Sequence, residues 1–335
     1  MAGIVGQLGE KRLLAEVILP RVNPNRDPHL AGDDSAVLDI PDGSAVCIST
    51  DRVPWDLTAY SLKLMSEFDL GYYLAVLNLS DIAAMGGVPI GLLLNIAVPS
   101  DFPVDYLTSI VDGAVAAANQ NHCGIIGGDL SDSVEPSLCA TSIGFTRQNA
   151  ALLRYGSEPG DAIYMTRPFG LCATAFRYFR EAKPQGMQLD SGDEANLRSA
   201  LVRPVPQLQV GKALAQRKLR ITAMDNTDGL SQSLAELATI NGKRFMLDAR
   251  LIPVNPITAS VADFLQEDPI HLGTGPGADM NLVGTVSDPS LIDEMNMIRI
   301  GVVQEGKGVS IATDTGVQPL PLNGWEYFRE PAGRK

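Results

Sequence analysis

Apolar runs of two kinds alternate with short polar stretches through the first half of the chain. After Ser66, residues 67–84 begin with acids in the first turn and are followed by a Gly-Gly pair, a pattern that predicts a helix. Residues 90–98, IGLLLNIAV, form a short and almost continuous apolar run, which predicts a buried strand. The same criteria predict further helices at 10–19 and 103–121 and strands at 45–50, 122–128 and 137–146. This alternation predicts an α/β domain.

A turn-rich stretch at 154–161, RYGSEPGD, separates this half from a second one. The second half has predicted strands at 162–166, 221–225, 244–249, 280–286 and 298–303, and predicted helices at 170–182, after residue 207 and at 229–242. The polar segment 183–196 is predicted to be a mobile loop, and GGDLSDS at 127–133 a turn. We expect two domains of mixed α/β (α+β) class, residues 1–148 and residues 149–335.

The amino-acid composition limits the kinds of partner that the protein can bind. The net charge of −13 argues against a nucleic-acid-binding surface, which needs a basic stripe, but divalent metals can still bridge an acidic protein to phosphates. The most apolar window, 74–98, is interrupted by polar residues, glycines and a proline, so it predicts no membrane span. The first residues lack the basic and apolar blocks of a signal peptide, and we expect a cytoplasmic protein. Four widely spaced cysteines and three histidines argue against a zinc site.

Short acidic motifs recur at the ends of apolar segments. They are AGDDSAVL at 31–38, STD at 49–51, LNLSDIAAM at 77–85, GGDLSDS at 127–133 and MDNTDGL at 224–230. Each aspartate alone is explained by a turn or a helix cap. Asp81 is harder to explain in this way, because its helical neighbours Leu77, Ala84 and Met85 are apolar and a buried carboxylate needs a partner. Together the acids form a set of hard oxygen ligands, which indicates several Mg²⁺ ions, a polyphosphate and phosphoryl transfer.

Two common phosphate-binding motifs are not supported. GTGPGA at 273–278 fits a dinucleotide-binding pattern, but it follows EDPIHL and not a hydrophobic strand. No GxxxxGK[ST] sequence occurs, so a P-loop is excluded.

The acidic motifs carry a family resemblance. GDDSAVL, STD, LNLSDIAAMGG, GGDLS, LLRYGSEPGD and MDNTDGLSQSL resemble, in order, the motifs of the thiamine-monophosphate kinase family. That family is similar to aminoimidazole ribonucleotide synthetase, selenophosphate synthetase and the hydrogenase-maturation dehydratase. The resemblance implies a ferredoxin-like N-terminal domain that binds metal and ATP and pairs across a homodimer into a barrel-like core. It also implies a C-terminal α/β sandwich domain that closes the cleft for ATP and acceptor.

The resemblance further implies a set of site residues. The metal ligands, for two or more Mg²⁺ ions, would be Asp34, Ser49, Thr50, Asp51, Asp81, Asp129, Asp225 and Asp228. The contacts to ATP would be Gly128, Arg154 and Thr227, with Asp129, Asp228 and Arg154 as the catalytic residues.

The residues implied for the acceptor depart from the family pattern. Thr58 stands where the family has a substrate-contacting histidine. Within GPGADMNL at 275–282, Ala278 and Asn281 replace the two glutamates of the family's GGEDYEL motif, whereas Trp325 supplies the late aromatic residue. Arg167 stands where the family often has glycine, and it is either an ordinary surface residue or a contact to an anionic group of a different acceptor. These changes predict a kinase whose small acceptor is not thiamine monophosphate.

Three alternatives remain open from the sequence. The chain is also compatible with a genuine thiamine-monophosphate kinase, with an ATP-dependent synthetase or dehydratase of the same superfamily, and with a non-catalytic nucleotide-binding protein. The acceptor group itself is a phosphate or a hydroxyl. A phosphate is already an anionic nucleophile, whereas a hydroxyl needs a carboxylate to accept its proton.

Overall fold

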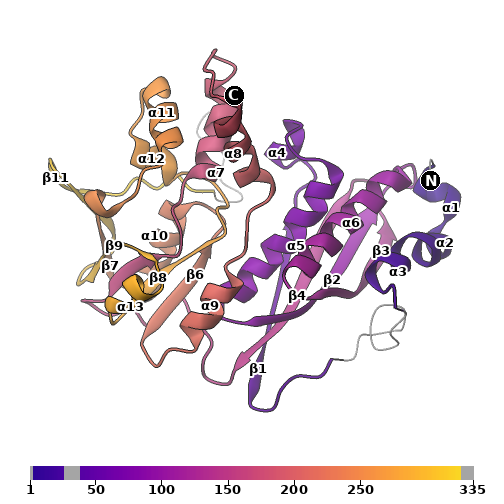
Figure 1. Ribbon diagram of the computed structural model, residues 1–335, viewed down its shortest axis with the longest axis horizontal. Helices are drawn as coiled ribbons and strands as arrows, with labels where there is room; N and C mark the ends of the chain where they lie inside the picture. The colour runs from indigo at the N-terminus through magenta and orange to yellow at the C-terminus, as the bar shows by residue number, and fades with distance from the viewer. Residues whose placement is uncertain (1–2, 26–37, 326–335) are drawn as a thin grey trace. The chain divides into compact units, whose positions relative to one another are not determined.

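The computed structural model describes residues 3–25 and 38–325 (Figure 1). Contacts divide the chain into two compact units, Met1–Leu152 with Val202–Arg217, and Leu153–Leu201 with Lys218–Lys335. The first change of unit lies close to the predicted boundary after residue 148, and the segment Val202–Arg217 returns to the first unit.

A four-stranded mixed sheet forms the base of the first unit. Its strand order is β1 (Ser44–Val53), β4 (Ser137–Arg147), β2 (Val88–Val98) and β3 (Gly124–Asp132). β4 pairs antiparallel with β1 and β2, whereas β2 and β3 are parallel. In the described residues the order from β1 to β4 along the chain is β-α-β-α-β-β, with the short helix before α5 left out. A ferredoxin-like domain has the order β-α-β-β-α-β, so the ferredoxin-like prediction is wrong.

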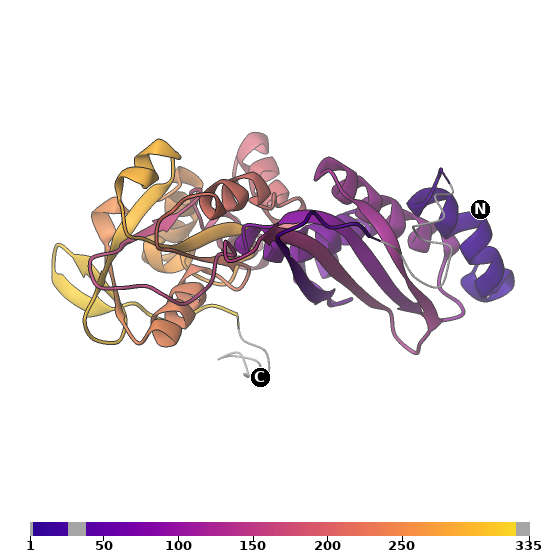
Figure 2. The same cartoon turned by 90° about the horizontal axis from the view of Figure 1, so that it is seen from below.

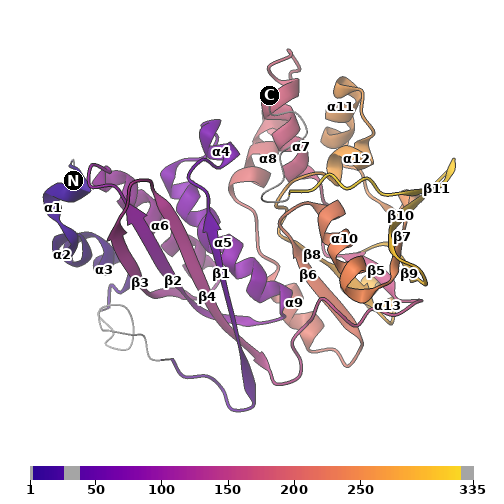
Figure 3. The same cartoon turned by 180° about the vertical axis from the view of Figure 1, so that it is seen from behind.

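Two long helices, α5 (Glu67–Ala84) and α6 (Val104–Gln120), cover one face of this sheet. Figure 3 looks onto the opposite face, and Figure 2 shows the sheet obliquely. The helices approach each other closely, because an added Cβ at Gly71 would lie 1.8 Å from the carbonyl oxygen of Ile110, and one at Gly113 would lie 1.9 Å from that of Phe68. Ser66 caps α5 in a capping box with Asp69, as the acids of the first turn predicted.

Shorter elements complete the first unit. The N-terminal segment contains α1 (Val5–Leu8), α2 (Glu10–Leu13), a π-helical turn (Leu14–Ile18) and α3 (Leu19–Val22), and α4 spans Thr58–Ser61. Helix α9 (Leu208–Ala215) packs on α5. Arg203, just before α9, pairs with Asp69 at 2.8 Å and lies over the rings of Phe68 and Tyr72. This ion pair and ring contact hold the returning segment on α5.

The second unit is built on a seven-stranded sheet. Its order is β11 (Gly316–Pro319), β10 (Gly308–Thr313), β7 (Arg244–Asp248), β9 (Ile298–Gln304), β5 (Ala162–Met165), β8 (Asn281–Val286) and β6 (Ile221–Asn226). β10 and β7 are parallel, and the other neighbours are antiparallel. Phe245, Leu247, Val283 and Ile300 lie in its hydrophobic core with Leu234 and Leu237 from helix α10 (Leu230–Asn241).

Further helices of the second unit carry the loops of the candidate site. They are α7 (Leu171–Arg177) with its π-helical continuation (Tyr178–Ala182), α8 (Ser191–Val202), a 3-10 turn (Ala249–Leu251), α11 (Pro256–Leu265), α12 (Pro269–Gly273) and α13 (Ser290–Glu294). None of the helices in the described ranges is long and apolar enough to cross a membrane.

Two local predictions are wrong. Residues 191–196 belong to α8 and not to a loop, because Asp190 accepts the N–H of Asp193 at 2.8 Å at the start of the helix. The composition of the segment 127–133 predicts a turn. In the structure, β3 continues to Asp132, because it pairs with β2 as far as Val98. The mixed α/β class and the long helices and strands predicted in both halves are confirmed.

Candidate functional site

In the first unit, β1 and α5 bring three of the predicted ligands close together. Ser49 and Asp51 are two residues apart on β1, so both side chains face α5. The hydroxyl of Ser49 donates to the carboxylate of Asp81 at 2.6 Å. The N–H of Asp51 donates to the side-chain oxygen of Asn78 at 3.0 Å. Asn78 was not predicted, although a polar residue one helical turn before Asp81 on an apolar helix is a signal for it.

Thr50 and Asp129 do not join this group. The hydroxyl of Thr50 donates to the carbonyl oxygen of Ala140 on β4 at 2.9 Å, on the sheet face away from α5. Asp129 is exposed and lies beside Asn95 in the β2–β3 register. Among the residues that the structure describes, no three His, Cys, Asp or Glu side chains are arranged to hold a metal ion. Asp34 lies outside the described residues.

The backbone conformation and packing at residue 128 require a glycine. Its φ is 148°, and an added Cβ would lie 1.8 Å from the carbonyl oxygen of Leu94 on β2. The β2–β3 pairing is also irregular nearby, between Leu92 and Leu93. The glycine therefore lets β3 continue next to β2 up to Asp129, and no side chain there separates a ligand from the backbone.

In the second unit, the turn from β6 to α10 holds a pair of carboxylates. Asp225 is buried at the end of β6, and Asp228 lies in the turn just before α10. The pKa of Asp228 is raised, first by burial and then by the neighbouring charges of Asp225 and Glu236, whereas Arg154 opposes the shift. Thr227 is half-buried between the two aspartates. Crowded carboxylates with a raised pKa are the electrostatic condition that a bound divalent cation relieves.

Arg154 lies near this turn on a fixed backbone. Its guanidinium pairs with Glu236 of α10. Asn241, at the end of α10, donates to the carbonyl oxygen of Arg154 at 2.9 Å and accepts the N–H groups of Gly156 and Ser157 at 2.7 and 2.9 Å. Asn241 was not predicted, because nothing in its local sequence points to the segment that it binds. Arg154 is thus an exposed cation held at the edge of the carboxylate pair.

The polar side chains at the start of β8 form hydrogen bonds within the second unit. The amide of Asn281 donates to the carbonyl oxygens of Pro168 and Arg167 at 2.9 and 3.3 Å. The carboxylate of Asp279 accepts the N–H groups of Gly170 and Cys172 at 2.7 and 3.1 Å, and burial raises its pKa to about 6. Both side chains therefore fix the loop before α7. Asp279 was missed by sequence reasoning.

The other predicted acceptor residues lie on both units. Thr58 is half-buried at the start of α4 in the first unit. Ala278 is buried, and Trp325 is 45% exposed, in the second unit. The backbone N–H of Trp325 donates to the carbonyl oxygen of Asp228 at 2.8 Å, which brings this aromatic residue to the carboxylate turn.

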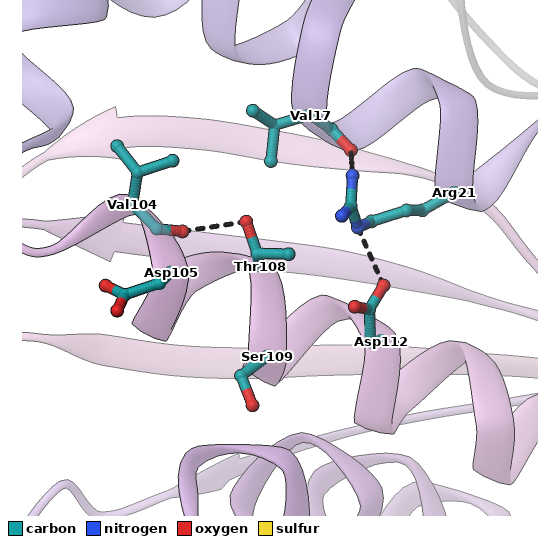
Figure 4. A pocket seen from close by; sticks show the side chains of 7 residues that line it. All are labelled: Val17, Arg21, Val104, Asp105, Thr108, Ser109 and Asp112. Carbon is teal, nitrogen blue, oxygen red and sulfur yellow. Dashed lines mark hydrogen bonds and ion pairs between the residues drawn. The ribbon is translucent and has the colours of Figure 1, made fainter. Parts of the chain in front are cut away.

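A separate cavity lies away from these residues. It has a volume of about 310 Å³ and lies between the N-terminal helical segment and α6 (Figure 4). Arg21 in its wall donates to Asp112 at 2.7 Å and to the carbonyl oxygen of Val17 at 2.6 Å. No predicted site residue lines it. The lining places Arg21 among two carboxylates, Asp105 and Asp112, so its charge does not favour a phosphate.

Comparison with known proteins shows which family the chain belongs to. Residues 32–146 match the family described as AIR synthase related protein, N-terminal domain. The chain is 31% identical to the thiamine-monophosphate kinase of Escherichia coli O157:H7 over 282 residues, which cover 84% of this chain and 83% of that protein. It is 27% identical to the thiamine-monophosphate kinase of Pyrococcus horikoshii over 304 residues, 90% of this chain and 92% of that protein.

Two solved structures have the same fold. The thiamine-monophosphate kinase from Stenotrophomonas maltophilia K279a has a TM-score of 0.76 and 25% identity, with 89% of this chain and 96% of that chain covered. AaThiL complexed with AMPPCP and TMP has a TM-score of 0.74 and 22% identity, with 96% and 98% covered. The chain belongs to the thiamine-monophosphate kinase family of ATP-dependent phosphotransferases.

Proposed function

We propose that the chain is a Mg²⁺- and ATP-dependent kinase that transfers the γ-phosphate of ATP to a small metabolite other than thiamine monophosphate. The observation that carries the kinase assignment is the turn from β6 to α10, where burial and then the charge of Asp225 raise the pKa of Asp228 beside Arg154. Two crowded carboxylates next to a fixed arginine fit a magnesium-phosphate complex. Relatives across most of the chain are named as thiamine-monophosphate kinases, which supports the reaction class.

The donor set fits Mg²⁺ and not a softer metal. In the second unit Asp225 and Asp228 supply carboxylate oxygens, and Thr227 between them supplies a hydroxyl. In the first unit Ser49 and Asp81 share a hydrogen bond that a cation would replace. From the sequence pattern we also assign metal binding to Asp51, Asp129 and Asp34, and nucleotide contacts to Gly128, Arg154 and Thr227. Thr50 is left out of the set, because its hydroxyl donates to the carbonyl oxygen of Ala140 on the sheet face away from α5. The metal would neutralise phosphate charge, while the protein positions the reacting groups.

The altered acceptor rests on the segment 275–282. Asn281, which replaces a glutamate of the family motif, donates its amide to the backbone of Arg167 and Pro168. Ala278, which replaces the other, is buried and has no polar side-chain atom. Neither residue can offer a carboxylate to the cationic ring of thiamine. A lost charged contact of this kind costs about 1.5–3 kcal/mol.

Arg167 points to the charge of the new acceptor group. Asn281 and Asp279 fix the loop that carries it, and its side chain is exposed. No ion pair is formed by its guanidinium with any residue in the described ranges. We infer that Arg167 contacts an anionic group of the acceptor, together with Thr58 and Trp325 as further acceptor contacts. If that group is a phosphate, transfer needs no strong general base.

The proposed kinase is a homodimer. Figure 3 looks onto the sheet face opposite α5 and α6. In the described part of the chain, Val46 is 46% exposed and Ile48 is 68% exposed, two residues apart on β1 and so on one face of the sheet. Ile143 and Phe145 lie opposite them on β4. An apolar sheet face of this kind favours burial against a second copy, which would give the barrel-like core. Light scattering should show a dimer, and Ile48→Glu should shift it toward the monomer.

The function is tested by product analysis. The protein is incubated with Mg²⁺, ATP and a panel of phosphorylated and hydroxylated metabolites that includes thiamine monophosphate, and ADP release is followed by mass analysis. We expect ADP with a phosphorylated product for an anionic acceptor, and little turnover of thiamine monophosphate. Fast turnover of thiamine monophosphate would overturn the altered acceptor.

Other outcomes identify the remaining alternatives. ADP with orthophosphate and no phosphorylated product would indicate a synthetase or dehydratase reaction. Tight binding of Mg²⁺-ATP without ADP from any acceptor would indicate a nucleotide-binding protein and overturn the kinase assignment.

A further inference from the structure

Residues 321–325, here called the C-terminal strap, cross the carboxylate turn of the second unit. The strap follows Leu320, which is buried in the hydrophobic core and donates its N–H to the carbonyl oxygen of Val309 at 3.1 Å. It reaches the turn at Trp325, whose N–H donates to the carbonyl oxygen of Asp228 at 2.8 Å. The strap therefore connects the sheet core to the backbone of a proposed metal ligand.

Asn323 ties the middle of the strap to two helices. Its side-chain oxygen accepts the hydroxyl hydrogen bond of Ser231 at 2.9 Å, at the start of α10. Its amide donates to the carbonyl oxygen of His271 in α12 at 2.9 Å. Ser231 in turn donates its N–H to the carbonyl oxygen of Thr274 at 3.1 Å. One side chain thus links the strap, the start of α10 and the segment that leads to Ala278.

The packing around Asn323 leaves little room for the strap to shift. An added Cβ at Gly324 would lie 2.4 Å from the Cβ of Gln232 and 2.8 Å from the carbonyl oxygen of Asp228. An added Cβ at Gly229 would lie 2.2 Å from the carbonyl oxygen of Gly275. The strap is therefore packed directly on the turn at Asp228, and this turn is packed on the segment at Gly275. A displaced strap would move the turn with it.

We propose that Asn323 is a positioning residue that fixes the strap so that Trp325 and the Asp228 turn keep one mutual geometry. This inference rests on the proposed function, in which Trp325 contacts the acceptor and Asp228 binds the metal. Asn323 touches neither ligand and acts through the strap. Loss of its side-chain hydrogen bonds to Ser231 and His271 would let the proposed acceptor wall and the proposed metal site move independently.

The first test needs no ligand. The chain has two tryptophans, so Trp55→Phe leaves Trp325 as the only indole. In this background, acrylamide quenching of Trp325 emission is compared between the parent and Asn323→Ala. Release of the strap should raise the quenching constant about twofold, because local opening exposes the ring. An unchanged constant would overturn the role of Asn323.

The second test measures coupling to the nucleotide side. The parent and Asn323→Ala, both with Trp55→Phe, are titrated with Mg²⁺ and AMPPCP while Trp325 emission is recorded. Binding near Asp228 should change the emission of the parent, and Asn323→Ala should reduce this change about fivefold. Equal changes in the two proteins would contradict the coupling.

Controls separate the role of Asn323 from loss of folding and from failure of the proposed function. Asn119→Ala, at an exposed position of α6, should leave both readouts unchanged. If Asn323→Ala does not fold, Ser231→Ala takes its place, because it removes the hydroxyl that donates to Asn323. It should raise the quenching constant and reduce the emission change on ligand binding. A parent that binds no Mg²⁺-AMPPCP by calorimetry would overturn the proposed function, whereas the quenching comparison still decides the role of Asn323.

Discussion

The end of β6 and the beginning of β8 are neighbours in the same sheet, yet their polar side chains serve different purposes. Asp225 lies opposite Leu282, and Asn226 lies opposite Asn281. At the end of β6, burial and then the charge of Asp225 raise the pKa of Asp228. At the start of β8, Asp279 and Asn281 are hydrogen-bonded to the backbone of the loop before α7. Crowded carboxylates indicate ligand binding, whereas hydrogen-bonded polar groups indicate support of the fold.

The largest expected effect is on the β6 side. Asp228→Asn should lower kcat about a hundredfold to a thousandfold, because it removes a charge that, in the proposed function, holds the magnesium-phosphate complex. The variant should be at least as stable as the parent without metal, since the native state no longer holds a carboxylate of raised pKa beside Asp225. ADP release and thermal unfolding measure the two effects. Full activity in Asp228→Asn would remove this turn from the site.

Ligand binding should sharpen the same contrast. Mg²⁺ with AMPPCP at a hundred times its Kd should stabilise the parent by about 2.7 kcal/mol. Asp225→Asn should lose most of this gain, whereas Asp279→Asn should keep it, because Asp279 bonds only to Gly170 and Cys172 among the described contacts. Denaturant unfolding with and without the ligand gives both values. Equal losses in the two variants would show that the β8 side also binds the ligand.

On the β8 side we expect a loss of stability rather than of nucleotide binding. Asp279→Ala leaves the N–H groups of Gly170 and Cys172 without their acceptor, which should lower the free energy of unfolding by about 2 kcal/mol. Urea unfolding measures the change, with the exposed Asp263→Ala as the control. A weakened affinity for AMPPCP with unchanged stability would reverse the assignment.

The smallest expected effect is a pH slope. The folded pKa of Asp279 is about 6, above the ordinary value of 3.8, so between these values the native state holds more protons than the unfolded state. Its contribution to stability should therefore fall as pH rises from 4 to 6, by about 1 kcal/mol per pH unit. The difference between parent and Asp279→Asn in unfolding experiments across this range isolates the effect. A stability difference that does not vary with pH would exclude a raised pKa for Asp279.

Much of the fold follows from local patterns. The helix at 67–84 has its apolar run, its capping serine and its acids within one segment, and the structure places it where the pattern does. The segments 127–133 and 191–196 were predicted wrongly for opposite reasons. In the first segment, pairing with β2 extends β3 through a glycine-rich sequence. In the second, an acidic residue in a sequence typical of a loop caps the helix α8. Tertiary pairing and capping override composition in both places.

The proposed ligand chemistry came from the sequence alone, because hard oxygen donors are a property of residue type and recur in short motifs around Asp51, Asp81 and Asp228. Only the tertiary structure decided which polar residues serve the fold. Asn281 finds its partners at Arg167 and Pro168, more than a hundred positions away in the chain. Asn323 finds its side-chain partner Ser231 at a similar distance. A hydrogen-bond partner so remote leaves no mark in the local pattern, so folding alone shows whether a polar side chain is already occupied.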